Sequence, residues 1–376
     1  MPPFSTPGVH RLDAFPQPPP SLLTGVPVFL GTAASGPWTP ERVATWPRFV
    51  QLYGPGPAPL ADAVRGFFAC GGLVCQVVRL RGPGPSALRS GLAVIADLDE
   101  IDLVCAPGIG EDATETVAAQ RAILGHCRAR GDRVALLDAL RAPGDVADQA
   151  AALTGPDGAY GALYHPWLVV ADPAARPVPP CGHVAGTVSR GDREVGVHKA
   201  PANQDLADVL DVDVGLGGAR IGELYAAGVN CIRALPGRGV RAWGARTLSG
   251  VPAGRDLAAR RVLVTIARWL ELFMAGLVHE PHDVRLRVRV LREVGAYLEG
   301  LHRQGALRGR TAEEAFSVRC DDQTNPAASV DAGMFVTEIG VTLGVAAEFV
   351  VVRVIHGASG VELRMPGDVP GNVKED

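Results

Sequence analysis

The sequence lacks the signals that identify a structural zinc site, a membrane span or a nucleic-acid binder. Its seven cysteines are odd in number and scattered, without a CxxC pair, which fits reduced, mostly buried thiols in a cytosolic protein. Aromatic residues make up only 5% of the chain and the net charge is −4, so electrostatic attraction to nucleic acid is not indicated. No uncharged apolar run reaches transmembrane length, and the first residues lack the basic and apolar regions of a signal peptide. We therefore expect no nucleic-acid partner and no direct membrane insertion.

Motifs of catalysis and cofactor binding are missing as well. The sequence contains neither the HExxH pattern of a zinc hydrolase nor the GxSxG turn of a serine hydrolase. The turn Pro107–Gly110 is nearest to a phosphate loop, but it lacks the lysine and hydroxyl of GxxxxGK[ST] and the spacing of GxGxxG. We expect no catalytic residue, no cofactor and no metal site. One enzymatic alternative stays open, a nucleotide-binding α/β enzyme that uses residues 101–138.

Strand-like and helical segments alternate along much of the chain, which indicates an α/β to α+β fold. At 376 residues, the chain is long enough for about two or three subdomains. Ile101–Ala106, Thr114–Arg130 and Arg133–Asp138 predict a βαβ unit with parallel strands. The other periodic segments are Val26–Leu30, Leu60–Cys70, Leu73–Leu80, Val146–Leu153, Ala219–Ala227, Asn230–Leu235, Arg255–Leu277, Asp283–Arg303, Phe316–Cys320, Gly333–Val341 and Glu348–Ile355.

The stretch Pro179–Asn203 is crowded with glycine, proline, histidine and mixed charge. Its prolines suit the first turn of a helix, on which small residues would share one face and let another backbone approach. Those small residues are Gly182, Ala185, Gly186 and Ser189, and the charged residues Arg190, Asp192, Arg193 and Glu194 follow them. Asn203 is expected to cap a short helix over Gln204–Leu210. The residues alone leave two interpretations open, an active site or a tightly packed helix with a capped loop.

Both ends of the sequence are expected to form extended arms. Residues 1–20 contain several prolines and cannot form a stable helix, and the residues from Gly357 onward hold one β-like piece. The apolar residues of these arms, which a solvated tail would not need, are Val9, Leu12, Phe15, Val361 and Leu363. An apolar arm at each end predicts strand addition to a neighbouring chain.

Four arginines lie near the start of the predicted helix Asp283–Arg303. They are Arg285, Arg287, Arg289 and Arg292. Such a cluster is usually a solvated helix face, and its functional interpretation is docking to an acidic protein surface.

Several blocks of the sequence, in their order and spacing, resemble the phage tail sheath protein family. The blocks are LYHPWLVV (163–170), VPPCGHVAGTVSRGDREVGVHKAPAN (178–203), GVNCIRALPGRGVRAWGARTLS (228–249), RR (260–261) and GALRGRTAEEAFSVRCDDQTNP (305–326). At the front, TPGVHRLD (6–13), TGVPVFLGTAASGP (24–37) and LADAVRGFFACGGLVCQVVRL (60–80) resemble the family's arm and first core segment. The chain is short for a phage sheath protein. Its length is similar to that of the compact sheath proteins of phage-tail-like contractile injection systems.

The resemblance implies a structural protein without catalysis. It implies a tail-sheath-like core of mixed sheets and helices, and subunits that stack as six-membered rings around an inner tube and contract to drive the tube through a target envelope. The partners implied are other copies of the chain, an inner tube protein, baseplate and terminator or cap proteins, and an AAA+ ATPase. Assembly would take place in the bacterial cytoplasm, as part of a phage tail or a phage-tail-like particle.

Together these interpretations give an expected layout with two arms and three core segments. The segments are an N-terminal arm (1–20), a first core part (21–100), a βαβ-containing subdomain (101–175), a C-terminal core domain (176–356) and a C-terminal arm (357–376). Within the sheath, we expect Arg190, Asp192, Arg193 and Lys199 at or near subunit contacts. The arginine cluster 285–292 resembles the family's basic helix that faces the inner tube.

Overall fold

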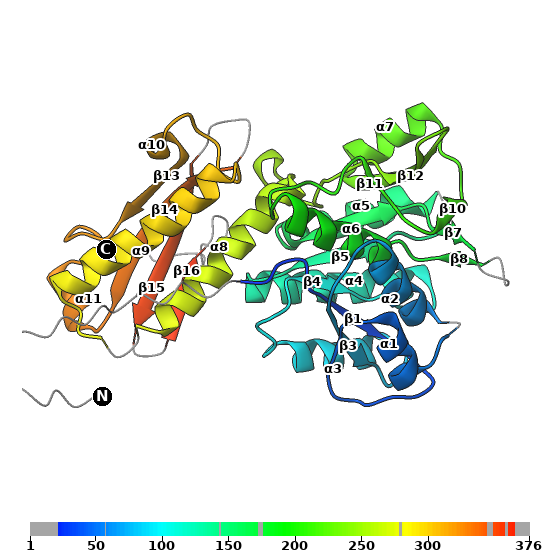
Figure 1. The fold of residues 1–376 in the computed structure, drawn as a ribbon, viewed down its shortest axis with the longest axis horizontal. Coiled ribbons are helices and arrows are strands. Elements are labelled where there is room, and N and C mark those ends of the chain that lie inside the picture. The colour runs from blue at the N-terminus through cyan, green and yellow to red at the C-terminus, as the bar shows by residue number, and fades with distance from the viewer. Residues whose placement is uncertain are drawn as a thin grey trace, which may run out of the picture.

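The computed structural model describes residues 22–56, 58–142, 144–171, 176–277, 280–343, 349–357 and 360–364. These residues form two lobes that are joined through the long helix α8, Leu257–Ala275 (Figure 1). The expected N-terminal arm, with Val9, Leu12 and Phe15, lies outside the described residues.

A nine-stranded sheet forms the centre of the larger lobe. Its order is β2-β3-β1-β4-β5-β6-β11-β12-β9, and the strands from β3 to β11 run parallel. The order β3-β1-β4-β5-β6 is that of a doubly wound domain, so the expected fold class and the parallel βαβ unit are confirmed. The strands are β1 (Pro27–Gly31), β2 (Glu41–Val43), β3 (Cys75–Arg79), β4 (Leu103–Cys105), β5 (Val134–Asp138), β6 (Gly161–His165), β9 (Gln204–Asp205), β11 (Val229–Leu235) and β12 (Gly239–Ala242).

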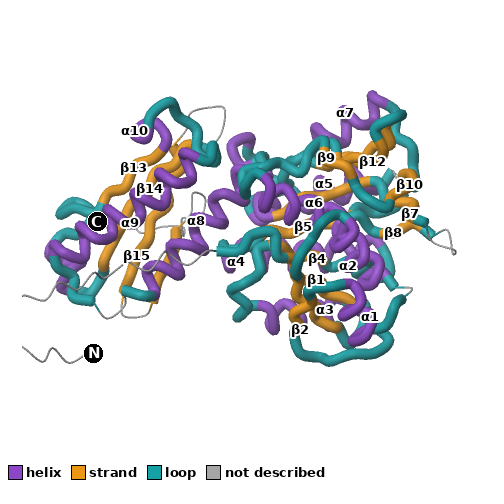
Figure 2. The backbone as a smooth tube through the Cα atoms, in the orientation of Figure 1, coloured by secondary structure: helices purple, strands orange, loops and turns teal. Residues whose placement is uncertain are grey.

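Helices cover both faces of this sheet and alternate with its strands along the chain (Figure 2). Helices α2 and α6 pack against each other on one face, and α3, α4 and α5 lie together on the other (Figure 1). Helix α4 starts where the Asp112 carboxylate accepts the Glu115 amide and ends at left-handed Gly131. The helices are α1 (Trp46–Tyr53), α2 (Pro59–Ala69), α3 (Pro85–Ile95), α4 (Ala113–Arg130), α5 (Asp145–Leu153), α6 (Cys181–Glu194), α7 (Gly218–Ala226) and the 3-10 turns η1 (Asp157–Tyr160) and η2 (Pro252–Gly254).

A small sheet of order β10-β7-β8 lies beside the large one and corrects one expectation. Its strands are β7 (Leu168–Val170), β8 (Pro177–Val178) and β10 (Val209–Val212). The helix expected over Gln204–Leu210 is therefore wrong, because this segment pairs with β12 through β9 and with β7 through β10. Asn203 turns the chain with a φ of 58° and does not cap a helix.

The smaller lobe packs two long helices on a four-stranded antiparallel sheet. Helix α9, Val284–Arg303, lies against α8, where the rings of Trp269 and Tyr297 stack with centroids 3.9 Å apart. The sheet has the order β13-β14-β15-β16. Its strands and short helices are α10 (Ala312–Ala315), β13 (Phe316–Arg319), α11 (Ala327–Asp331), β14 (Phe335–Thr342), β15 (Phe349–Gly357) and β16 (Gly360–Arg364).

Two features of the fold differ from the simple segment pattern. The sequence pattern did not assign residues Trp46–Tyr53 to a helix or to a strand. They form helix α1, whose first turn is capped by the Thr45 hydroxyl, which accepts the Arg48 amide. The large sheet runs without interruption through positions 100/101 and 175/176, where subdomain boundaries were expected. The two buried cores instead divide near the start of α8.

Candidate assembly surfaces

Helix α6 is the tightly packed helix that one interpretation of its small residues predicted. A Cβ atom on Gly182 would lie 2.1 Å from the Ala63 carbonyl oxygen, and one on Gly186 would lie 2.3 Å from that of Phe67. The backbones of α6 and α2 therefore touch, so larger side chains are excluded at both positions. The stretch Pro179–Asn203 begins with a packed helix, as the second of its two interpretations proposed.

Asp192, from the charged end of α6, faces the interior of the subunit. Its carboxylate receives both terminal nitrogens of Arg261 on α8, at 2.7 and 2.6 Å. Arg261 also donates to Asp102 at 3.1 Å, and the three side chains are at most 3% exposed. Burial alone would lower the pKa of Arg261, but the carboxylates of Asp192 and Asp102 raise it above its usual value. The carboxylate of Asp192 is thus buried and paired inside the subunit, and it is not available to a neighbouring subunit.

The other members of the expected contact set lie nearer the surface. Arg190 donates to the backbone oxygen and carboxylate of Asp205, and Arg193 donates to the carbonyl of Gly71. Arg193 is exposed, whereas Arg190 and Lys199 are partly exposed. Arg190, Arg193 and Lys199 remain the residues of this stretch that a neighbouring subunit could reach.

The four arginines of α9 are not equivalent. Arg287 pairs with Asp322, Arg289 with Glu280, and Arg292 with the adjacent Glu293. Arg285 is exposed and has no ion-pair partner among the residues that the structure describes. The sequence pattern could not separate these four, because their partners come from other segments.

The exposed face of α9 also carries two valines. The buried stripe of α9 follows Leu286, Val290 and Val294 into the core. On the opposite side, Val284 and Val288 are 71% and 57% exposed. Residues 284, 285, 288 and 292 share one helical face, so this surface, the α9 face, combines apolar and basic groups.

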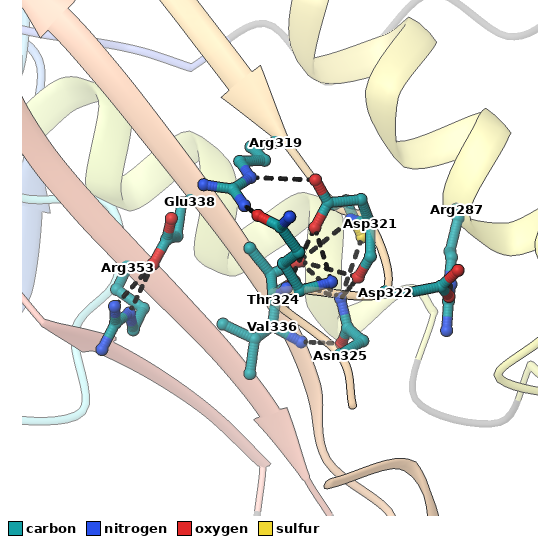
Figure 3. A network of polar contacts seen from close by, with 11 residues as sticks. Arg287, Arg319, Asp321, Asp322, Thr324, Asn325, Val336, Glu338 and Arg353 are labelled. Atoms are coloured by element: carbon teal, nitrogen blue, oxygen red, sulfur yellow. Dashed lines mark hydrogen bonds and ion pairs between the residues drawn. The ribbon is translucent and has the colours of Figure 1, made fainter. Parts of the chain in front are cut away.

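A loop after β13 fixes the start of α9 to the small sheet. In Figure 3, Asn325 reaches β14, where its side chain donates to the Val336 carbonyl and accepts the Val336 amide, at 2.8 and 2.7 Å. The Asp321 carboxylate accepts the amides of Gln323 and Thr324 at 2.9 and 3.0 Å. Asp322 then holds Arg287 (Figure 3). The loop thus contacts the start of α9 through one exposed ion pair, whereas the buried stripe of α9 holds the helix on the core.

Strand β16 lies at one edge of the small sheet. Its backbone pairs with β15 of the same chain from Gly357↔Gly360 to Arg353↔Arg364. The predicted arm residues Val361 and Leu363 belong to this strand. Because β16 is an edge strand, one side of its backbone has no strand partner among the described residues.

The turn Pro107–Gly110, on which the nucleotide alternative depends, borders an acidic cavity. Doubly wound domains bind ligands at the carboxyl ends of the strands where the order reverses, here between β1 and β4. A cavity of about 450 Å³ lies beside the turn, and its lining includes Glu111, Asp112 and Asp145. The first turn of α4 is capped by its own Asp112, with Glu111 and Glu115 beside it. Three carboxylates at the helix N-terminus disfavour a phosphate, and this alternative is not supported.

Burial shifts the pKa of several ionisable groups, but among the described residues these groups do not come together as a chemical site. It raises the pKa of Asp138 to about 7, against the opposing hydrogen bond from the Cys181 amide, and it lowers the pKa of His183 to about 4. It also raises the pKa of Cys70 to about 11. No group of three metal-ligating side chains gathers in the described part of the chain. Among the described helices, none has the length and apolar character that a bilayer crossing requires.

Comparisons with known proteins agree with this geometry. Residues 90–248 match the phage tail sheath protein central domain. The contracted helical sheath of the anti-feeding prophage is 28% identical with a TM-score of 0.73, over 92% of this chain and 97% of that one. The contracted sheath of the extracellular contractile injection system PVC is 25% identical with a TM-score of 0.73, over 90% and 95%. A sheath tail protein from Desulfitobacterium hafniense shares the fold at 11% identity, with a TM-score of 0.67 over 93% and 100%. No curated protein sequence matches.

Proposed function

We propose that this chain, which is similar to phage tail sheath proteins in sequence and in fold, is the structural subunit of a contractile sheath. One observation carries the proposal: its fold follows two contracted sheaths of injection systems over at least 90% of its length. The acidic first turn of α4, which disfavours a bound phosphate, supports a structural role over the nucleotide-binding alternative.

The assembly that we infer stacks six-membered rings of this subunit around an inner tube. The arms, through Val9, Leu12, Phe15, Val361 and Leu363, add strands to neighbouring subunits. The free edge of β16 supports this part of the proposal, since an edge strand is a template for β-addition. Arg190, Arg193 and Lys199 would lie at or near contacts between subunits. Contacts that do not close on themselves build helices, as a sheath requires.

The further partners that we propose are baseplate and terminator or cap proteins, with an AAA+ ATPase acting on the sheath. Assembly would take place in the bacterial cytoplasm, and the product is a phage tail or a tail-like particle.

Electron microscopy of the expressed chain tests the proposed function. With its tube and baseplate proteins present, we expect hollow helical sheaths around tubes, in extended or contracted form. The subunit alone, at raised concentration, serves as the control for tube-independent polymerisation. Subunits that stay monomeric under all these conditions would contradict the proposal.

The α9 face is the surface that we propose for the inner tube. Its four members are Val284, Arg285, Val288 and Arg292. Arg287 and Arg289 lie outside this face of the helix and pair with Asp322 and Glu280 within the subunit. Arg292 pairs with the adjacent Glu293, but its side chain stays 70% exposed on the face. The tube surface that fits is acidic with a small apolar centre.

Charge reversal of the α9 face tests this contact. The double substitution Arg285→Glu and Arg292→Glu should weaken co-assembly of sheath and tube by about tenfold or more, because like charges across an interface cost several kcal/mol. Sheath–sheath polymerisation should stay unchanged in the same micrographs. The matched control is Arg303→Glu at the other end of α9, where the side chain is 73% exposed. Equal co-assembly of the double variant and the control would remove the α9 face from the tube interface.

A further inference from the structure

The chain enters the larger lobe through a short segment that is held by buried charge. This segment, the arm root, comprises residues 22–26 and connects the residues before it to β1. Leu22 packs against the core of the smaller lobe, and Val26 is buried in the core of the larger lobe. The arm root is therefore a second covalent crossing between the lobes, beside α8.

Asp102 binds the backbone of the arm root directly. Its carboxylate accepts the amide of Gly25 through Oδ2 at 2.9 Å and the amide of Val26 through Oδ1 at 2.7 Å. In return, the Val26 carbonyl accepts the Asp102 amide at 3.1 Å. The carboxylate is 3% exposed, so these amides are among the few donors that can satisfy it.

The charges of the cluster show why the arm root is needed. Asp102 and Asp192 bring two negative charges to the single positive charge of Arg261, in a site closed to water. Arg261 gives Asp192 two hydrogen bonds and Asp102 one. The remaining capacity of Asp102 is filled by the amides of the arm root. A buried charge without such partners is strongly unfavourable, so the cluster and the arm root stabilise each other.

Two further contacts hold the same segment. Arg268 lies on the same side of α8 as Arg261. It donates to the Leu23 carbonyl at 3.1 Å and to the Asp99 carbonyl at 3.0 Å. Gly25 has a φ of +69°, and a Cβ atom there would lie 2.6 Å from the Ser189 backbone of α6. The arm root is thus threaded between α6 and α8, with no room for a side chain at Gly25.

From these contacts we propose that Asp102, oriented by Arg261, anchors the N-terminal arm. Tension on the residues before Leu22 then passes into α6 of the larger lobe and into α8, which joins the two lobes, and does not pull β1 out of the sheet. Asp102 and Arg261 are positioning residues for the arm. The mechanical part of this inference rests on the proposed function, in which the arm links neighbouring subunits.

A pair of matched variants tests the anchor in the full-length chain before assembly. Asp102→Asn leaves a single acceptor oxygen for the amides of Gly25 and Val26, so one of these two amides loses its partner. Asp192→Asn also removes one carboxylate from Arg261 but leaves the arm root untouched. We expect hydrogen exchange at the Gly25 or the Val26 amide to rise by roughly ten- to hundredfold in Asp102→Asn, the factor for loss of a bond to a charged acceptor. In Asp192→Asn both amides should stay protected.

A second pair keeps the test valid where Asp102→Asn fails to fold. Gly25→Ala forces the arm root away from α6, whereas Gly131→Ala has the same φ of +69° and no heavy atom within 4 Å of the new Cβ. Exchange at Val26 should rise in the first variant and not in the second. Unchanged exchange at both Gly25 and Val26 in Asp102→Asn, or an equal rise in Asp192→Asn, would overturn the anchor.

Contraction of assembled sheaths supplies the functional readout. Sheaths of Asp102→Asn should assemble but separate into short pieces on contraction, and those of Asp192→Asn should stay continuous. Continuous contracted sheaths from Asp102→Asn, with Gly25 or Val26 exchange raised, would overturn the transmission of tension. A failure of the arms themselves would appear differently, as normal assembly of a chain without residues 1–20 while the exchange results stand.

Discussion

A chain that lacks residues 1–20 is expected to stay folded and to form no sheath. The described residues from Leu22 onward already form two extensive buried cores, and we expect these cores to hold the fold without the deleted segment. The arm would contribute a strand to a neighbour, and each main-chain hydrogen bond of such a strand is worth about 1 kcal/mol. Loss of several such bonds per contact, repeated along the helix, should abolish polymerisation at concentrations where the full chain assembles.

At the C-terminal end, the same experiment can be carried out with two deletions of different length. Deletion of residues 357–376 removes β16, five residues that pair with β15, whereas deletion of residues 365–376 keeps this strand. We expect the longer deletion to block polymerisation. Electron microscopy measures assembly, and circular dichroism with thermal melting shows that each truncated subunit is folded. Normal sheaths from both the N-terminal and the longer C-terminal truncation would show that the arms are not the linkers.

The largest loss of stability is expected for Gly182→Ala in α6. The new methyl carbon would lie 2.1 Å from the Ala63 carbonyl oxygen and 2.4 Å from its Cα atom. Because these are backbone atoms of α2, relief requires a shift of one helix, at a cost of about 3 kcal/mol or more. Separation of α2 from α6 would also open the packing of the larger lobe around Phe67.

The same substitution at another helical glycine gives the control, with the opposite sign. Gly295 lies inside α9, and a Cβ atom there would meet no heavy atom within 4 Å. Gly295→Ala should therefore raise the free energy of unfolding by roughly 0.5–1 kcal/mol, through helix propensity alone. Chemical denaturation of the two variants and the parent chain measures both effects. A stability of Gly182→Ala equal to that of the parent would mean that α2 and α6 are not in backbone contact.

Regular elements of this fold were predictable where the local pattern agrees with the tertiary structure. The helix expected at Thr114–Arg130 and the parallel strands on either side of it are confirmed, because a run rich in helix-forming residues between two apolar strands has few alternatives. The small face of α6 was visible in the same way, from the spacing of Gly182, Ala185, Gly186 and Ser189.

The segments and residues that the sequence did not place depend on distant partners. Gln204–Leu210 has no strong local preference, and its two short strands exist through pairing with β12 and β7. Asp192 was grouped with its exposed neighbours, since its partner Arg261 is 69 positions away and Asp102 lies in another block. In the sequence, Arg261 was noted only as part of the pair RR (260–261), one of the blocks that resemble the tail sheath family. The available signal was the spacing of Arg261 and Arg268, which lie seven residues apart on a largely apolar side of a long helix.

The separation of the anchor residues along the chain has a consequence for synthesis. The arm root leaves the ribosome first, but Asp102 follows 77 residues after Gly25, and Arg261 a further 159 residues later. Domains of large proteins generally fold as units during translation, from the N-terminus onward. A nascent subunit therefore cannot fix the base of its arm until more than two thirds of the chain is made. Until Arg261 is made, the arm of the proposed sheath subunit would be attached only loosely to the larger lobe.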